Sequence, residues 1–118
     1  MEGLSVSVES GDGAVVITVA GEIDIASAPG LRDALAEAMR RPPRTLTVDL
    51  AQVSFIDSSG LNALSWVKRV APDTEVVLAS PSRQCRRILE ISGLDQVFTL
   101  EPPAADAAAG EPSPPSGG

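Results

Sequence analysis

Residues 45–61 read TLTVDLAQVSFIDSSGL. The alternating and β-branched run from Thr45 to Leu50 predicts a strand, and the apolar residues 53–56 carry the chain on towards Asp57. From Ser58 the apolar period lengthens to that of a helix ending at about Val70. Its inward stripe is predicted to be Leu61, Leu64, Val67 and Ala71. A buried strand followed at once by a helix is the unit from which α/β folds are built.

The residues before this unit predict a hairpin and a helix. Residues 4–8 alternate apolar and polar side chains, Gly11-Asp12-Gly13 is typical of a tight turn, and residues 14–20 predict a second strand that ends at Gly21. Ser27 is a candidate N-cap for a helix that runs to about Met39. The hairpin therefore precedes the first helix.

The residues after the unit continue the alternation. They predict a strand over 75–79, a helix that begins at Ser80 or Ser82 and closes near Gly93, and a short strand over 97–100. Alternation of this kind predicts a single α/β domain over residues 1–100. We expect a mixed, mostly parallel sheet with an N-terminal hairpin and three to four helices packed on it. Residues 101–118 are rich in Ala, Pro and Gly, and predict a disordered tail.

Composition excludes several functions. The 118-residue chain contains no histidine and one cysteine, so we expect no metal site and no cofactor. A formal net charge of −7 argues against nucleic acid or an anionic membrane as the partner. The N-terminus lacks the features of a signal peptide, and no apolar run approaches the ~20 residues of a membrane-spanning helix. We therefore expect a cytoplasmic protein.

The start of the helix at residue 58 is the candidate site. A helix N-terminus carries unpaired amides and partial positive charge, so a phosphate on Ser58 would be tolerated there. Such a phosphate beside Asp57 would add roughly −1.5 to −2 charges to the surface. Gly60 would leave room for a partner to approach. The alternative is that Asp57 or Ser58 only caps the helix, and the two interpretations are compatible.

Two rival interpretations, an enzyme and a receiver domain, fail on missing residues. A serine hydrolase needs a base, and the chain has no histidine and no G-x-S-x-G elbow. The single lysine, Lys68, is ten residues beyond Ser58, about 15 Å along the helix. A receiver domain phosphorylated on Asp57 would need an acidic pair and a lysine at other strand ends, and neither is present. We expect no catalytic residue.

Two other features remain open in the sequence. Trp66 lies off the stripe of Leu61 and Leu64, and it either packs at the edge of the core or is exposed as a partner anchor. Three arginines, Arg83, Arg86 and Arg87, cluster at the start of the last helix. They form a solvated basic face or contact an acidic partner.

Three motifs resemble those of one known family. Residues 53–61, VSFIDSSGL, resemble the signature of the anti-sigma factor antagonists of the STAS family. The GEID segment at 21–24 and the LEISGL segment at 89–94 resemble further family motifs, in the same order and at the same spacing. The resemblance covers residues 4–100 and implies a STAS-type domain.

The resemblance also implies a switch. In this family the serine after the motif aspartate, here Ser58, is phosphorylated by an anti-sigma factor that is a serine kinase with a histidine-kinase-like ATPase fold. The unphosphorylated protein binds that kinase and frees the sigma factor, phosphorylation ends binding, and a metal-dependent serine phosphatase reverses it. Ser59 is the second candidate for modification.

The same resemblance implies a docking surface. It assigns partner binding to Asp24, Asp57, Ser58, Ser59 and Gly60. Asp24 has an alternative interpretation as an ordinary solvated loop carboxylate. For the whole chain, the alternative is a STAS interaction module that does not switch, such as a transporter subunit or a scaffold in a stress-signalling assembly.

Overall fold

The strands and helices alternate along the chain after an initial hairpin. The computed structural model describes residues 4–102. In chain order the elements are β1 (Ser5–Gly11), β2 (Ala14–Ile23), α1 (Ala28–Ala38), β3 (Thr45–Ile56), α2 (Ser58–Val70), β4 (Glu75–Ala79), α3 (Arg83–Ser92), a 3₁₀ turn (Leu94–Gln96) and β5 (Thr99–Glu101). This order confirms the predicted α/β fold class, with three α-helices in the described part of the chain.

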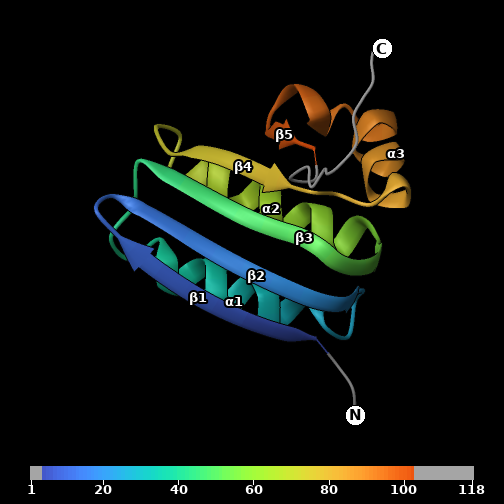
Figure 1. The fold of residues 1–118 in the computed structure, drawn as a ribbon, viewed down its shortest axis with the longest axis horizontal. Helices are drawn as coiled ribbons and strands as arrows, with labels where there is room; N and C mark the ends of the chain where they lie inside the picture. The colour runs from blue at the N-terminus through green and yellow to red at the C-terminus, as the bar shows by residue number, and fades with distance from the viewer. Residues whose placement is uncertain (1–3, 103–118) are drawn as a thin grey trace, which may run out of the picture.

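The strands form one sheet in the order β1-β2-β3-β4-β5. β1 and β2 pair antiparallel, and the other three pairs are parallel. Each parallel connection passes through one α-helix, as expected for parallel strands joined by crossovers. Figure 1 shows α1 and α2 side by side behind the sheet. The mixed, mostly parallel sheet with an N-terminal hairpin is therefore confirmed.

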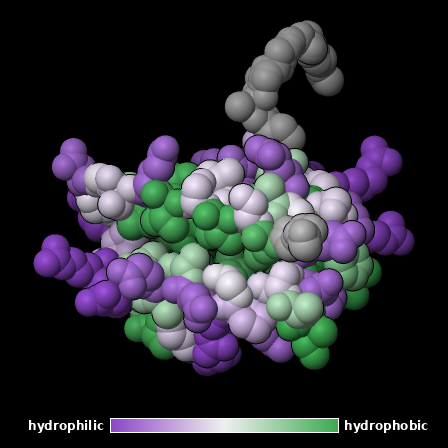
Figure 2. Space-filling view, turned by 90° about the horizontal axis from the view of Figure 1, so that it is seen from below, coloured by the Kyte–Doolittle hydropathy of each residue, from purple (hydrophilic) through white to green (hydrophobic). Residues whose placement is uncertain are grey.

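The core lies between this helix layer and the sheet. Every second residue is buried from Val15 to Val19 in β2 and in the first half of β3, as expected for strands with one covered face. The helices contribute the buried stripes Leu31 and Leu35 from α1, and Leu61, Leu64 and Val67 from α2. Figure 2 shows a band of hydrophobic surface bordered by hydrophilic side chains on one side of the molecule.

The parallel arrangement decides where the candidate site lies. β2 and β3 pair along their whole lengths and end together, with Ile23 opposite Ile56. The loop after β2 and the first turn of α2 therefore meet at the same edge of the sheet. This edge holds the motif residues that lie about 35 positions apart in the sequence.

Two strands are longer than predicted. β2 continues through Gly21 to Ile23, so the prediction that Gly21 ends the strand is wrong. The pairing of β2 with β3 is irregular there, with register shifts between Thr18 and Ala20 and between Gly21 and Glu22. The irregularity accommodates the glycine without ending the strand. β3 is one strand of 12 residues and does not break at Ala51.

The C-terminal elements match the sequence with small shifts. α3 begins after Ser82, whose hydroxyl accepts from the Cys85 amide at 3.1 Å, and ends at Gly93 in the left-handed conformation. The last strand is Thr99–Glu101, because the amides of Val97 and Phe98 donate to the Leu94 carbonyl of the 3₁₀ turn instead of joining the sheet. β5 thus includes Glu101, the first residue of the predicted tail. Residues 103–118 lie outside the described residues, so their predicted disorder stays a prediction.

Burial decides between the two interpretations of Trp66 but not between those of the three arginines. Trp66 is half-buried against the core, with the Arg32 guanidinium 4.7 Å from its ring centre. The three arginines of α3 are exposed, which is compatible both with a solvated face and with contact to an acidic partner. Within residues 4–102, none of the helices has the length and apolar character needed to cross a membrane.

Candidate functional site

Asp57 is the N-cap of α2. Its backbone is extended, and its Oδ1 accepts a hydrogen bond from the Ser59 amide at 2.8 Å. The Leu61 amide donates to the Asp57 carbonyl at 3.1 Å and begins the helical ladder. Of the two predicted capping residues, Asp57 is therefore the N-cap, and the Ser58 side chain does not cap the helix.

Ser58 is the exposed hydroxyl of the site. It is the first residue of α2 and is exposed, whereas Ser59 is half-buried. Among residues 4–102 the Ser58 side chain makes no hydrogen bond. The helix end beside it carries partial positive charge, which favours an added phosphate. Ser58 can therefore be modified without breaking a contact seen in the fold.

Gly60 has a packing role rather than the expected one. It is buried, and a Cβ at this position would lie 2.6 Å from Ile23 Cγ2 and 2.7 Å from Ile56 Cγ1. These two side chains come from the ends of β2 and β3. Gly60 thus lets the first turn of α2 lie directly on the sheet. The space left by the missing Cβ is occupied by Ile23 and Ile56 and is not open to a partner.

A backbone hydrogen bond joins the two halves of the site. The Asp57 amide donates to the Ile23 carbonyl at 3.1 Å. Ile23 is the last residue of β2, and Asp24 begins the loop that leads to α1. The hydrogen bond therefore places the β2–α1 loop beside the start of α2.

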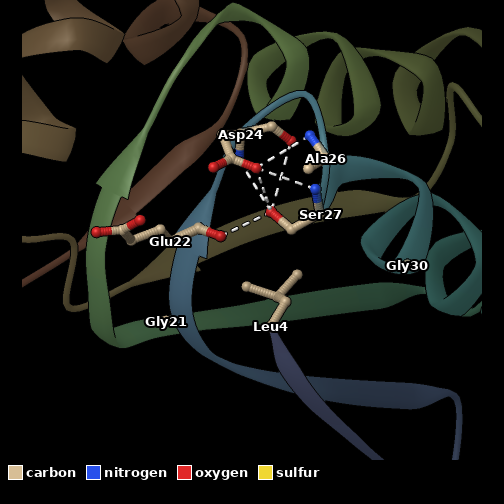
Figure 3. Close-up of a pocket in the computed structure, with 7 residues that line it drawn as sticks. All are labelled: Leu4, Gly21, Glu22, Asp24, Ala26, Ser27 and Gly30. Atoms are coloured by element: carbon tan, nitrogen blue, oxygen red, sulfur yellow. Dashed lines mark hydrogen bonds between the residues drawn. The ribbon is translucent and has the colours of Figure 1, made fainter. Parts of the chain in front are cut away.

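Asp24 holds this loop in shape. Its Oδ1 accepts from the amides of Ala26 and Ser27, both at 3.0 Å, and its own amide donates to Ser27 Oγ at 2.9 Å. The Ser27 hydroxyl in turn donates to the Glu22 carbonyl at 2.7 Å. Figure 3 shows these groups converging on the Asp24 carboxylate. Asp24 is thus a structural carboxylate and not simply a solvated one, and Ser27 uses its side chain here instead of capping α1.

Asp24→Ala should lower the free energy of unfolding by about 1–2 kcal/mol, because two amides lose a charged acceptor. Urea denaturation followed by circular dichroism measures the change. Asp33→Ala is the control, since Asp33 is exposed on α1 and makes no side-chain hydrogen bond among the described residues; it should change stability by less than about 0.5 kcal/mol. Equal stability of the Asp24 variant and the unsubstituted protein would contradict the structural role.

A shallow hollow lies between α1 and α2 beside the serines. Its volume is about 390 Å³, and it is lined by Ile25, Ala28, Pro29, Arg32, Asp33, Ser59, Asn62 and Ala63. Ile25 is 80% exposed although it is a large apolar residue. No sequence pattern singles out Ile25, since only the fold shows which isoleucine lies in a tight loop with its side chain in solvent.

Lys68 does not lie where it could act as a general base for Ser58. That side chain lies near the opposite end of α2, where its Nζ donates to the Thr74 carbonyl at 3.0 Å. The arrangement at the start of α2 can cap a helix, expose a hydroxyl and present a loop. These properties suit a surface that another protein recognises and modifies.

The sequence pattern of the STAS domain matches residues 5–107. The chain belongs to the STAS domain family. The match covers all nine elements described above, so the fold and the family assignment agree. The resemblance of the three motifs is thereby confirmed.

Curated STAS relatives share most of the chain. The anti-sigma-F factor antagonist RsfB of Mycobacterium tuberculosis is 29% identical over 110 residues, covering 92% of this chain and 90% of that protein. An anti-sigma-B factor antagonist of Listeria monocytogenes is 33% identical over 87 residues, covering 72% of this chain and 76% of its own length.

A solved STAS structure agrees with the fold. The anti-sigma factor antagonist from Mycobacterium paratuberculosis superposes with a TM-score of 0.78 at 33% sequence identity. The superposition covers 89% of this chain and 91% of that one. The backbone that places Ser58 at the edge of the sheet is therefore shared with a named antagonist.

Proposed function

We propose that this STAS domain is an anti-sigma factor antagonist that works by switching partners. Its unphosphorylated form binds an anti-sigma factor kinase and so releases the sigma factor, and phosphorylation of Ser58 abolishes the binding. The observation that carries the proposal is the exposed Ser58 hydroxyl at the first position of α2, beside the capping Asp57. The names of the relatives support the same role.

The switch follows from charge. Phosphorylation would place roughly −1.5 to −2 charges next to the Asp57 carboxylate. A partner surface that covers a neutral hydroxyl would then have to desolvate a dianion beside a second anion. Juxtaposed like charges cost several kcal/mol, and ~1.4 kcal/mol already changes affinity tenfold.

The proposed docking surface consists of Ser58, its neighbours and the adjoining loop. Asp57 and Ser59 flank the modified residue, Asp24 shapes the loop beside it, and Gly60 acts through packing. The partners are an anti-sigma factor kinase with a histidine-kinase-like ATPase fold and a metal-dependent serine phosphatase. In this scheme the chain is the substrate of both enzymes, is not itself an enzyme, and acts in the cytoplasm.

Phosphate incorporation tests the proposed site. The chain is incubated with MgATP and, one at a time, with purified anti-sigma factor kinases of the source organism, and the modified residue is mapped by mass spectrometry. Ser58→Ala should lose incorporation completely, because the accepting hydroxyl is gone. Ser59→Ala, the matched control at the half-buried neighbour, should keep it.

Two results would contradict the proposal. Incorporation that survives in Ser58→Ala and is lost in Ser59→Ala would move the switch to Ser59. Absence of incorporation with every kinase, together with stable binding to a transporter subunit or signalling scaffold, would make the chain an interaction module that does not switch.

A further inference from the structure

Ile25 is an apolar side chain held out in solvent. It is 80% exposed, the highest value among the large exposed hydrophobic residues of the described chain. Single exposed apolar residues are common and need no explanation by themselves. The position of Ile25 is what matters, because it lies in the β2–α1 loop next to the hollow between α1 and α2.

The loop that carries Ile25 is ordered in advance. Hydrogen bonds between Asp24 and Ser27 cross the loop. The amides of Asp24, Ala26 and Ser27 all donate within this network, so the backbone on both sides of Ile25 is held in place. A side chain presented from such a loop loses little backbone freedom when a partner binds. Preorganisation of this kind raises affinity by lowering the entropic cost of association.

Ile25 and Ser58 belong to one continuous surface. The Asp57 amide and the Ile23 carbonyl are 3.1 Å apart, so the Cα atoms of Ile25 and Ser58 are no more than about 18 Å apart by chain geometry. Ser59, which follows Ser58, lines the same hollow as Ile25. An ordinary protein interface buries about 800 Å² on each partner, a patch wide enough to include both positions.

The chemistry of the hollow indicates what would fill it. The lining divides into three kinds of side chain: apolar Ile25, Ala28, Pro29 and Ala63, polar Ser59 and Asn62, and charged Arg32 and Asp33. Arg32 is steadied by its stacking on Trp66 at 4.7 Å. An exposed isoleucine beside a shallow hollow with polar and charged walls suits an apolar side chain of a protein partner that also carries polar groups.

We propose that Ile25 and this hollow form the docking anchor for the kinase that modifies Ser58. The inference rests on the proposed function, since the occupant is the anti-sigma factor kinase. Ile25 packs against an apolar side chain of the kinase that enters the hollow, and this contact adds to the affinity of the unphosphorylated form. The kinase must approach Ser58 to transfer phosphate, so the same surface is covered in the reacting complex.

The test compares two exposed isoleucines. Ile25→Asp should weaken binding of the kinase identified by phosphate incorporation at least tenfold, and should lower kcat/KM for Ser58 phosphorylation by a similar factor. Ile91→Asp is the matched control, because Ile91 is 77% exposed in the last turn of α3 and does not line the hollow. It should bind and react like the unsubstituted protein. Ile25→Ser repeats the test without adding a charge, and thermal unfolding checks that both variants are folded.

The outcomes separate this inference from the proposed function. Unchanged binding of Ile25→Asp and Ile25→Ser, with binding lost in Ser58→Glu, would overturn the docking anchor and leave the switch in place. Unchanged binding in all three variants would overturn both. If the Ile25 variants keep kinase affinity but abolish self-association in sedimentation experiments, the hollow is occupied by a second copy of the chain and the inference is wrong.

Discussion

Ser58→Glu should weaken binding to the anti-sigma factor kinase at least about 100-fold while the domain stays folded. Ser58 is exposed and its side chain makes no hydrogen bond within residues 4–102, so the substitution breaks no contact of the fold. An acidic residue in the first turn of a helix is also favoured by the helix dipole. The loss of binding follows because the new charge lies beside Asp57 at a surface that the kinase must cover.

Calorimetry with the purified kinase measures the affinity, and circular dichroism measures the fold. Ser10→Glu is the control for added charge, since Ser10 is exposed near the β-hairpin turn, at the opposite end of β2 from Ile23. It should bind like the unsubstituted protein. Two results would count against the account: unfolding of Ser58→Glu, which would show that Ser58 supports the domain, or equal losses of affinity in both variants.

Gly60→Ala should lower the free energy of unfolding by about 1–3 kcal/mol. The added Cβ would lie 2.6 Å from Ile23 Cγ2 and 2.7 Å from Ile56 Cγ1, and both isoleucines are fully buried. Neither side chain can move aside without disturbing the close packing between α2 and the sheet. The strain also bears on the site, because the same first turn carries Ser58.

Urea denaturation measures this loss, and Gly30→Ala is the matched control. Gly30 lies in α1, and a Cβ there would meet nothing within 4 Å. Alanine should therefore stabilise the chain at Gly30 by up to about 1 kcal/mol through helix propensity. A Gly60→Ala protein as stable as the unsubstituted one would show that α2 shifts easily on the sheet.

The sequence predicted the elements whose signals are local. α2 and β4 have the predicted bounds, because α2 combines a capping residue with a regular apolar stripe and β4 is a short apolar run. Gly93 ends α3 in the left-handed conformation that glycine tolerates best. Caps and apolar repeats of this kind depend only on residues a few positions apart, so they can be predicted from one sequence without knowledge of the fold.

The features that the sequence did not predict depend on contacts between residues far apart in the chain. Gly21 stays inside β2 because β3 pairs with it, and no local pattern reports that pairing. Gly60 could be selected as part of the motif, but its packing against Ile23 and Ile56 needs the fold. The exposure of Ile25 likewise follows from the Asp24 network and from the hydrogen bond between Asp57 and Ile23.

The central claim is that a phosphate on Ser58 switches kinase binding off, and one comparison tests it most directly. The chain is phosphorylated by its kinase, separated from the unmodified form, and both forms are titrated with the kinase by calorimetry. The account predicts tight binding of the unmodified form and at least about 100-fold weaker binding of the phosphorylated form. Equal affinities for the two forms would contradict it.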